Sequence, residues 1–180
     1  MGTLELALLI IGLVILIVIV PLIWFILTNN AFKRLQKEIN EAKIVLNTSI
    51  MTFYEVFIRT FNECVKKHHL DDDLVNSIKS IKGPNLNDGF EEKQKFVYQL
   101  FELIKVTVNE VNEKTLIKNS QEFNECLRRT NEEIEALYAA RRVYNASVSY
   151  FNQKRITFPH KIVGKLRGFT NYPFFETELP

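Results

Sequence analysis

The chain has 180 residues, with 23 Lys and Arg against 21 Asp and Glu, for a net charge of +2. This balance gives no support for a nucleic-acid binder, which needs a strong basic excess. The 47% share of hydrophobic residues excludes a disordered chain, and two cysteines are too few for a disulfide scaffold. Only one charged side chain, Glu5, lies within residues 1–30, so an apolar segment is joined to a charged one.

Residues 6–27 contain no charged side chain. As a helix they span roughly 33 Å, enough for a hydrocarbon core of about 30 Å. A cleaved signal peptide would need a basic start, a shorter apolar run and a small-residue cleavage site. Here the start is acidic and Asn29-Asn30-Ala31-Phe32 is no such site. Residues 1–30 are therefore predicted to be an uncleaved transmembrane anchor, with Trp24 at one membrane interface.

Basic residues follow the predicted span and none precedes it: Lys33, Arg34 and Lys37 come directly after it. Basic flanks stay on the cytoplasmic side. We therefore expect the N-terminus outside and residues 31–180 in the cytoplasm. Many Asn, Lys and Ile residues are typical of an AT-rich bacterial genome. The predicted location is the bacterial cytoplasmic (inner) membrane, crossed by a single pass.

Residues 31–158 carry apolar side chains at steps of three and four, which predict long amphipathic helices. The first runs to His69, continuing the anchor. A short helix follows from Asp71-Asp72-Asp73 to about Lys82, and a second long helix from Phe90 to Glu113. The third long helix begins near Asn119-Ser120, where Asn119 and Glu122 have capping-box spacing, and Pro159 ends it. The predicted class is all-α: one N-terminal transmembrane helix continuing into an antiparallel bundle of three long helices plus a short one.

Short connections between helices favour antiparallel neighbours. The second long helix is then expected to return towards the membrane and the third to leave it again, as in a coiled-coil stalk. In this arrangement Cys64 and Cys126 lie tens of ångströms apart, because each residue adds about 1.5 Å of rise. Both cysteines are predicted to be reduced, small buried residues.

The third long helix carries polar residues beside its apolar stripe, and four of them form a predicted structural ladder: Arg141, Tyr144, Asn145 and Asn152. Leu137, Phe151 and Phe158 flank this edge, so Arg141 and both asparagines should be at least half buried. Buried polar groups need hydrogen-bond partners. Counting rise from the helix ends makes Glu55, Glu91 or Glu92 the expected partner of Arg141. We favour a role in fixing helix register over ligand binding.

No catalytic motif is present, and no Gly-rich phosphate loop, paired Cys-x-x-Cys or G-x-S-x-G occurs. His68-His69 before Asp71-Asp72-Asp73 is the one metal-like cluster. Adjacent histidines point about 100° apart on a helix, so they lack zinc-ligand spacing. We therefore expect no enzyme activity, no metal and no cofactor.

Residues 159–180 form an aromatic and basic tail. A short amphipathic helix is predicted, with Ile162, Val163, Leu166 and Phe169 on one side and His160 and basic residues on the other. One interpretation is a cap folded onto the distal end of the bundle. The other is a contact surface for a second subunit or an anionic membrane. The candidate contact residues are Phe158, Pro159, Lys161, Lys165, Arg167, Phe169, Tyr172, Phe174 and Phe175.

The C-terminal region carries a spaced pattern that consists of Leu137, Arg141, Tyr144-Asn145, Val148, Phe151-Asn152, Phe158-Pro159, Ile162, Gly168-Phe169 and Phe175. In this pattern the region resembles the LemA family. The resemblance implies a single-span membrane protein with a cytoplasmic helical bundle. It implies no established biochemical activity, although some relatives are linked to the formation of internal membranes.

The leading hypothesis is a non-enzymatic, membrane-anchored scaffold that self-associates and shapes or organises membrane. Its expected partners are the lipid bilayer and further copies of itself, and no nucleic acid. The alternative is a membrane-tethered signalling or adaptor module that binds a cytoplasmic protein. Deletion of residues 159–180 should separate them, because a scaffold would lose assembly and an adaptor its partner.

Overall fold

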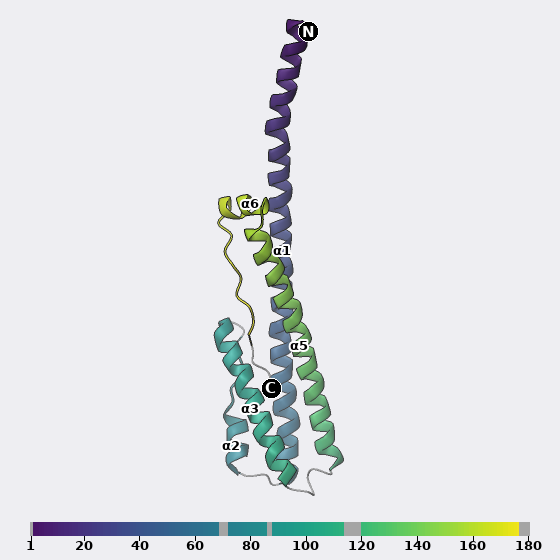
Figure 1. Cartoon of the computed structure of the whole chain (residues 1–180). Helices are drawn as coiled ribbons and strands as arrows, with labels where there is room; N and C mark the ends of the chain where they lie inside the picture. The colour runs from purple at the N-terminus through teal and green to yellow at the C-terminus, as the bar shows by residue number, and fades with distance from the viewer. Residues whose placement is uncertain (1, 69–71, 86–87, 114–119, 177–180) are drawn as a thin grey trace. The chain divides into compact units, whose positions relative to one another are not determined.

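The computed structural model describes residues 2–68, 72–85, 88–113 and 120–176 (Figure 1). Over these ranges the chain is helical with no strand, which confirms the all-α prediction. The helices are α1 (Thr3–His68), α2 (Asp72–Ser80), α3 (Phe90–Glu113), α5 (Gln121–Ile156) and α6 (His160–Leu166).

Helix α1 is a single helix of 66 residues, so the apolar N-terminal run continues into the bundle as predicted. No Gly or Pro occurs between Asn30 and His68, and nothing in that stretch therefore breaks the hydrogen-bond ladder. By length and composition α1 contains one stretch able to cross a membrane. In that window no residue is buried inside the protein.

The helix ends follow local chemistry. At the start of α5 the Ser120 hydroxyl accepts a hydrogen bond from the Phe123 N–H at 3.2 Å, so Ser120 is the cap. The predicted cap, Asn119, lies outside the described residues. At the start of α3 the Gly89 N–H donates to the Glu92 carboxylate at 2.7 Å. After α6, Gly168 has a φ of +65°, a conformation that glycine adopts without steric cost.

The chain divides into two compact units. The first, here called the anchor unit, contains Met1–Asn40 and Ser147–Pro173. The second, the bundle unit, contains Glu41–Ala146 and Phe174–Pro180. The anchor unit thus joins the apolar run of α1 to most of the tail, and the bundle unit contains α2, α3, residues 41–68 of α1 and residues 121–146 of α5.

Helix directions in the bundle unit differ from the prediction. The Lys93 ammonium donates to the Asn47 side chain at 3.1 Å, and the Phe96 ring lies 5.6 Å from Tyr54, so α3 runs parallel to α1. The chain returns through α2 and the segment that follows it, which Figure 1 shows beside α3. The Tyr54 hydroxyl holds that segment by donating to the Ile81 carbonyl at 3.2 Å.

The direction of α5 is consequently reversed as well. Phe90 stacks on Tyr144 at 5.2 Å, whereas Phe101 stacks on Tyr138 at 6.2 Å, so α5 is antiparallel to α3 and α1. The prediction that the second long helix returns and the third leaves was wrong. The helix directions differ because the return is made by α2, which is nine residues long, together with the extended segment after it.

The cysteine separation was wrong for the same reason. The Cys126 thiol donates to the Thr60 carbonyl at 3.4 Å, and Thr60 lies one helical turn before Cys64. Cys126 is buried, as predicted. The Cys64 side chain lies outside the described part of the chain, so its predicted burial stays a prediction.

The bundle core is built from the predicted stripes. Phe53, Phe57 and Phe61 of α1 are fully buried. Val97 and Leu100 of α3 and Leu137 and Tyr144 of α5 are buried as well. The periodicity of three and four residues therefore identified the core, although it did not establish which helices run parallel.

Candidate functional site

An aromatic cluster closes the anchor unit. The Phe32 ring lies 5.0 Å from Phe169 and 5.6 Å from Phe151, and Phe151 lies 5.0 Å from Tyr172. Phe32 and Phe151 are fully buried. Edge-to-face and tilted aromatic pairs at these spacings are favourable beyond the area they bury. The cluster ties α1 and α5 to the tail.

Asn152 binds the tail backbone with both ends of its amide. Its Nδ2 donates to the Tyr172 carbonyl at 3.0 Å, and its Oδ1 accepts from the Tyr172 N–H at 3.0 Å. The Gln36 amide also donates to the Tyr172 hydroxyl at 3.3 Å. A residue outside any helix or strand thus has its backbone donor and acceptor satisfied by one side chain.

Arg155 holds the preceding part of the tail. Its Nε donates to the Asn171 side-chain oxygen at 2.9 Å and one Nη to the Phe169 carbonyl at 3.4 Å. A Cβ at Gly164 would approach the Arg155 carbonyl to 3.2 Å. The close packing of α6 on the end of α5 therefore favours glycine at this position.

Asn145 repeats this arrangement in the bundle unit. Its Nδ2 donates to the Phe175 carbonyl at 3.0 Å, and its Oδ1 accepts from the Phe175 N–H at 2.9 Å. The Phe175 side chain is buried, with its ring 5.6 Å from Phe90. Together, the Asn145 and Asn152 contacts are called the asparagine clamps below.

The spacing of the clamps explains why one segment can satisfy both. Seven residues separate Asn145 from Asn152 on α5, which is about 10.5 Å of helical rise. Three residues separate Tyr172 from Phe175, which is about 10 Å of extended chain. Both clamps contact backbone atoms, so they fix the path and register of the tail whatever its side chains are.

The first turn of α3 contains a buried lysine, Lys93. Lys93 is almost completely buried and donates to Asn47 at 3.1 Å. Desolvation, with repulsion from Lys43, lowers the pKa of Lys93 from its ordinary value. Lys43 itself lies over the Phe90 ring at 5.1 Å. Lys93 lies between Phe90 and Val97 at helical spacing, which is the apolar stripe of α3, but no sequence pattern indicates its partner Asn47 on α1.

The four residues of the predicted polar ladder have different surroundings in the structure. Asn145 and Asn152 are mostly buried and bind the tail, and Tyr144 is buried against Phe90. Arg141 is mostly buried as well. A role in register is therefore compatible with the asparagines, but the register they fix is that of the tail rather than that of a neighbouring helix.

Glu55, Glu91 and Glu92 were the expected partners of Arg141 only if α5 ran in the same direction as α1, which it does not. Arg141 lies one turn from Tyr144, level with the Lys93–Asn47 pair and about two turns from Glu55. Glu91 pairs with Lys95 at 3.0 Å, and Glu92 accepts from Gly89. The contact of Arg141 with one of these carboxylates stays a prediction, and the helix directions no longer support it.

The tail folds onto its own chain, but not at the distal end of the bundle. Phe169 and Tyr172 pack on Phe32 and Phe151, just after the apolar run of α1, because α5 is antiparallel to α1. Phe175 is buried, whereas Phe158 and Phe174 are exposed. The distal cap is therefore wrong. On the short helix Val163 is buried, whereas Ile162 and Leu166 are exposed.

Basic tail residues lie beside the end of the span. Lys161, Lys165 and Arg167 are exposed, and the Arg167 guanidinium lies over the Phe25 ring at 5.6 Å. Trp24 is partly buried. The three residues used to predict orientation, Lys33, Arg34 and Lys37, are exposed, with Arg34 pairing with Glu38 at 3.5 Å.

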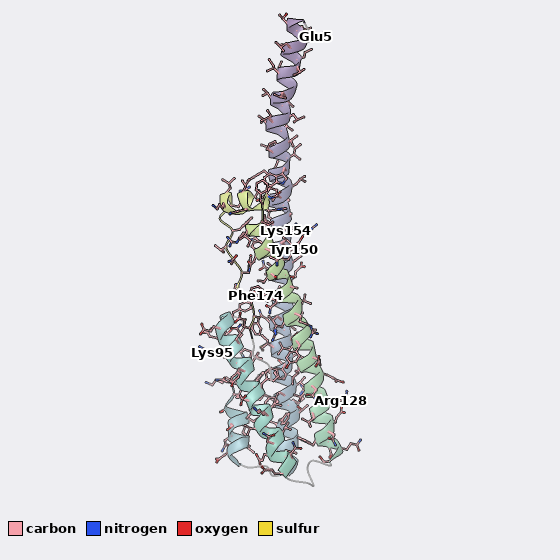
Figure 2. All side chains as sticks on the ribbon, in the orientation of Figure 1. Glu5, Lys95, Arg128, Tyr150, Lys154 and Phe174 are labelled. Atoms are coloured by element: carbon pink, nitrogen blue, oxygen red, sulfur yellow. The ribbon has the colours of Figure 1, made fainter. Side chains whose placement is uncertain are left out.

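Exposed ion pairs on α5 lie away from these contacts. Figure 2 labels Arg128 on the outside of α5, where it pairs with Glu125 at 2.7 Å and with Glu132. Arg128 and Arg129 lower the pKa of the Glu125 carboxyl to about 2. These pairs are solvent-exposed, and such pairs contribute little to stability.

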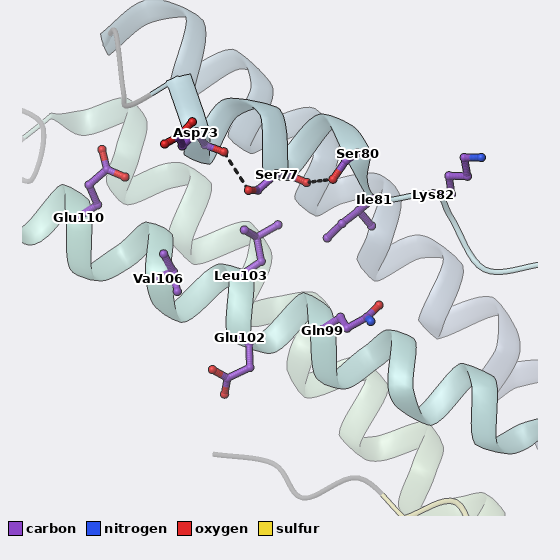
Figure 3. A pocket seen from close by; sticks show the side chains of 10 residues that line it. All are labelled: Asp73, Ser77, Ser80, Ile81, Lys82, Gln99, Glu102, Leu103, Val106 and Glu110. Atoms are coloured by element: carbon purple, nitrogen blue, oxygen red, sulfur yellow. Dashed lines mark hydrogen bonds between the residues drawn. The ribbon is translucent and has the colours of Figure 1, made fainter.

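A polar groove of about 880 Å³ lies between α2 and α3 (Figure 3). Its lining residues are Asp73, Ser77, Ser80, Ile81, Lys82, Gln99, Glu102, Leu103, Val106 and Glu110. The Ser77 and Ser80 hydroxyls donate to carbonyls of α2 at 2.8 Å, so they already have intrahelical partners. The groove has no arrangement of nucleophile and base.

Metal ligation finds no support where the chain is described: there, no three His, Cys, Asp or Glu side chains converge. The His68 side chain and residues 69–71 lie outside that part, so the predicted lack of a metal site at His68-His69 is untested.

Comparison with known proteins places these contacts in a family. No curated protein matches the chain. The family model described as "LemA family" matches residues 74–179, which include most of α2, all of α3, α5 and α6, both asparagine clamps and the tail that they hold. The match covers more than half of the sequence and agrees with the resemblance of residues 137–175. The chain therefore belongs to the LemA family.

Proposed function

We propose that this protein is a non-enzymatic scaffold, anchored in the bacterial cytoplasmic membrane by α1, whose copies self-associate and shape membrane. The observation that carries self-association is an exposed face of small and apolar residues on α1 and α5 of the bundle unit. We call it the valine–alanine face, and it consists of Val45, Ala136, Ala139 and Val143.

The valine–alanine face lies opposite α3. Along α1, Asn47 and Tyr54 contact α3 from one side of the core stripe, and at 100° per residue Val45 lies on the other side. Along α5, Tyr138 contacts Phe101 of α3, and Val143 lies on the opposite side. Val45 and Val143 also share one level, because Lys43, Phe90 and Tyr144 are in contact there. Exposed apolar patches of this kind are typical of protein–protein contacts.

Anchoring favours a contact between like faces. The exposed apolar run of α1 and the basic residues after it support a span with the bundle in the cytoplasm. Two copies held in one membrane present the valine–alanine face at the same height. A two-fold contact between identical patches is the commonest way in which identical chains associate.

The polar residues of the site support a structural role. Asn145, Asn152 and Arg155 all bind the tail, mainly through its backbone, and so are used to hold the fold. A catalytic role would need a nucleophile, acid or base directed into a cavity.

Disulfide cross-linking in membranes tests the face. In a chain carrying Cys64→Ser and Cys126→Ala, Val143→Cys should form disulfide-linked dimers upon mild oxidation. Val106→Cys on α3 is the matched control, because the two valines are 58% and 53% exposed. We expect at least several-fold more dimer from position 143. Equal yields from both positions, or none from position 143, would rule out this contact.

Membrane shaping is tested by electron microscopy of cells that overproduce the full chain. We expect altered membrane morphology with the unsubstituted protein and a normal envelope with Val143→Lys, which places a charge on the valine–alanine face. Normal morphology in both would contradict the shaping role while leaving self-association standing.

The groove between α2 and α3 supports the alternative function, a membrane-tethered adaptor for a cytoplasmic protein. Ser77→Arg would fill the groove without touching the valine–alanine face. An adaptor would lose its partner in this variant and keep it in Val143→Lys. A scaffold would lose self-association in Val143→Lys and keep it in Ser77→Arg.

A further inference from the structure

The boundary of the apolar span is marked by burial. Leu27 is the last exposed large apolar residue of the N-terminal run, and Thr28, Asn29 and Phe32 are buried. Arg167 contacts Phe25 and the His160 ring lies 6.4 Å from Phe32, so α6 lies beside this boundary. Figure 1 shows α6 beside α1 and roughly crosswise to its axis.

Helix α6 presents two exposed flanks. Val163 and Gly164 are buried and face the rest of the unit. Ile162 and Leu166, four residues apart, form an apolar flank, and Leu166 is 70% exposed. Lys161 and Lys165, also four residues apart, form a basic flank beside it. Phe158, just before α6, is 78% exposed, so three large apolar side chains face outward within nine residues.

The charge of this region is one-sided. Beyond the span, the anchor unit contains eight lysines and arginines and a single acid, Glu38. The basic residues are Lys33, Arg34, Lys37, Lys154, Arg155, Lys161, Lys165 and Arg167. A basic patch beside a membrane is attracted to the headgroups of anionic lipids. Exposed apolar side chains beside basic ones are typical of helices that lie in the interface.

We propose that α6 and Phe158 form an interfacial anchor that binds anionic phospholipid. Phe158, Ile162 and Leu166 enter the bilayer surface, and Lys161, Lys165 and Arg167 bind the headgroups. This inference rests on the proposed membrane span of α1. It gives the tail a second role, because Asn152 and Arg155 hold the residues after α6 beside the end of the apolar run. The span and the surface helix then bind the membrane together.

Spin labels on the reconstituted full chain test the proposal. In the background with Cys64→Ser and Cys126→Ala, Leu166→Cys is compared with Leu16→Cys in the span and with Tyr98→Cys, an exposed position on α3. Collision rates are measured with oxygen, which concentrates in lipid, and with a water-soluble nickel chelate. Vesicles contain phosphatidylcholine alone or with phosphatidylglycerol.

We expect an oxygen-to-nickel ratio at position 166 several-fold above that at position 98 and below that at position 16. Phosphatidylglycerol should raise the ratio at position 166, and Lys161→Glu with Lys165→Glu should abolish that rise. A ratio at position 166 equal to that at position 98, while position 16 is in lipid, would overturn the interfacial anchor and leave the span intact.

Two other outcomes would also contradict the proposal. Protection of position 166 from both reagents would show that protein covers the flank. A water-exposed label at position 16 would overturn the proposed span itself, and with it the basis of the interfacial anchor.

Discussion

Two asparagines on α5 have the same role in two different units. Each amide binds both the N–H and the carbonyl of one tail residue: Asn152 binds Tyr172 and Asn145 binds Phe175. The planar amide of Asn places an N–H donor beside a carbonyl acceptor, which matches the carbonyl and N–H of one backbone residue. The periodicity of the helix showed these positions to be partly buried, but their partners lie 20 and 30 residues further along the chain.

Asn152→Ala tests the clamp. The change leaves a partly buried donor and acceptor of Tyr172 unpaired, which costs about 2 kcal/mol or more. We expect a lower melting temperature of the full chain in mild detergent and faster tryptic cleavage at Lys165. Asn131→Ala, at an exposed position of the same helix, is the control and should change neither. Equal behaviour of the two variants would argue against the clamp.

The pKa of Lys93, lowered by burial, gives a pH dependence with a definite sign. Its ordinary value is 10.5. Between the lowered folded pKa and 10.5 the unfolded chain binds more protons, so the contribution of Lys93 to stability rises with pH. In Lys93→Met this rise should be lost, while stability at neutral pH changes little because a buried charge is replaced by an apolar chain of similar length. Chemical unfolding at a series of pH values measures the free energy of unfolding of both proteins. The same dependence on pH in the unsubstituted chain and in Lys93→Met would contradict this prediction.

At the scale of elements, the connections between helices determined the helix directions, which the apolar stripes do not indicate. The apolar pattern correctly identified four helices in the bundle and their extents to within a few residues. It could not show that α2 and the segment after it make the return, because a stripe indicates which side is buried and not which neighbour covers it. With α2 as the returning element, α3 became parallel to α1 and Cys126 came to lie beside Thr60.

Ser120 caps α5, and its loss is a test at this scale. Ser120→Ala removes the acceptor for the Phe123 N–H and should destabilise the chain by about 1 kcal/mol. Ser120→Asp keeps an acceptor and should retain most of the stability. The comparison is made by chemical unfolding of the full chain, and a loss of stability equal in both variants would mean that Ser120 acts by packing.

For the molecule as a whole, the tail is part of the core. Its residues contact Phe32 and Phe151 in the anchor unit and Phe90 in the bundle unit. Deletion of residues 159–180 would therefore remove buried aromatic side chains and is no clean test of assembly. Surface substitutions on the valine–alanine face and in the groove serve that purpose better.

Neighbouring phenylalanines in the tail make this testable. Phe175 is 1% exposed and Phe174 is 42% exposed. Phe175→Ala should lower the free energy of unfolding by about 3 kcal/mol or more, as expected for a buried ring, and Phe174→Ala by far less. Thermal unfolding of both full-length variants decides it, and similar losses would show that the tail is not packed as described.

The sequence by itself determined the apolar span, the all-α class, the core stripes and the LemA resemblance, because each depends on local pattern or on residue order. The tertiary structure decided the direction of α3 and α5, the place of the tail beside the span and the partners of Asn145, Asn152 and Lys93. These depend on contacts between residues far apart in the chain, and helical periodicity carries no information about which stripes meet.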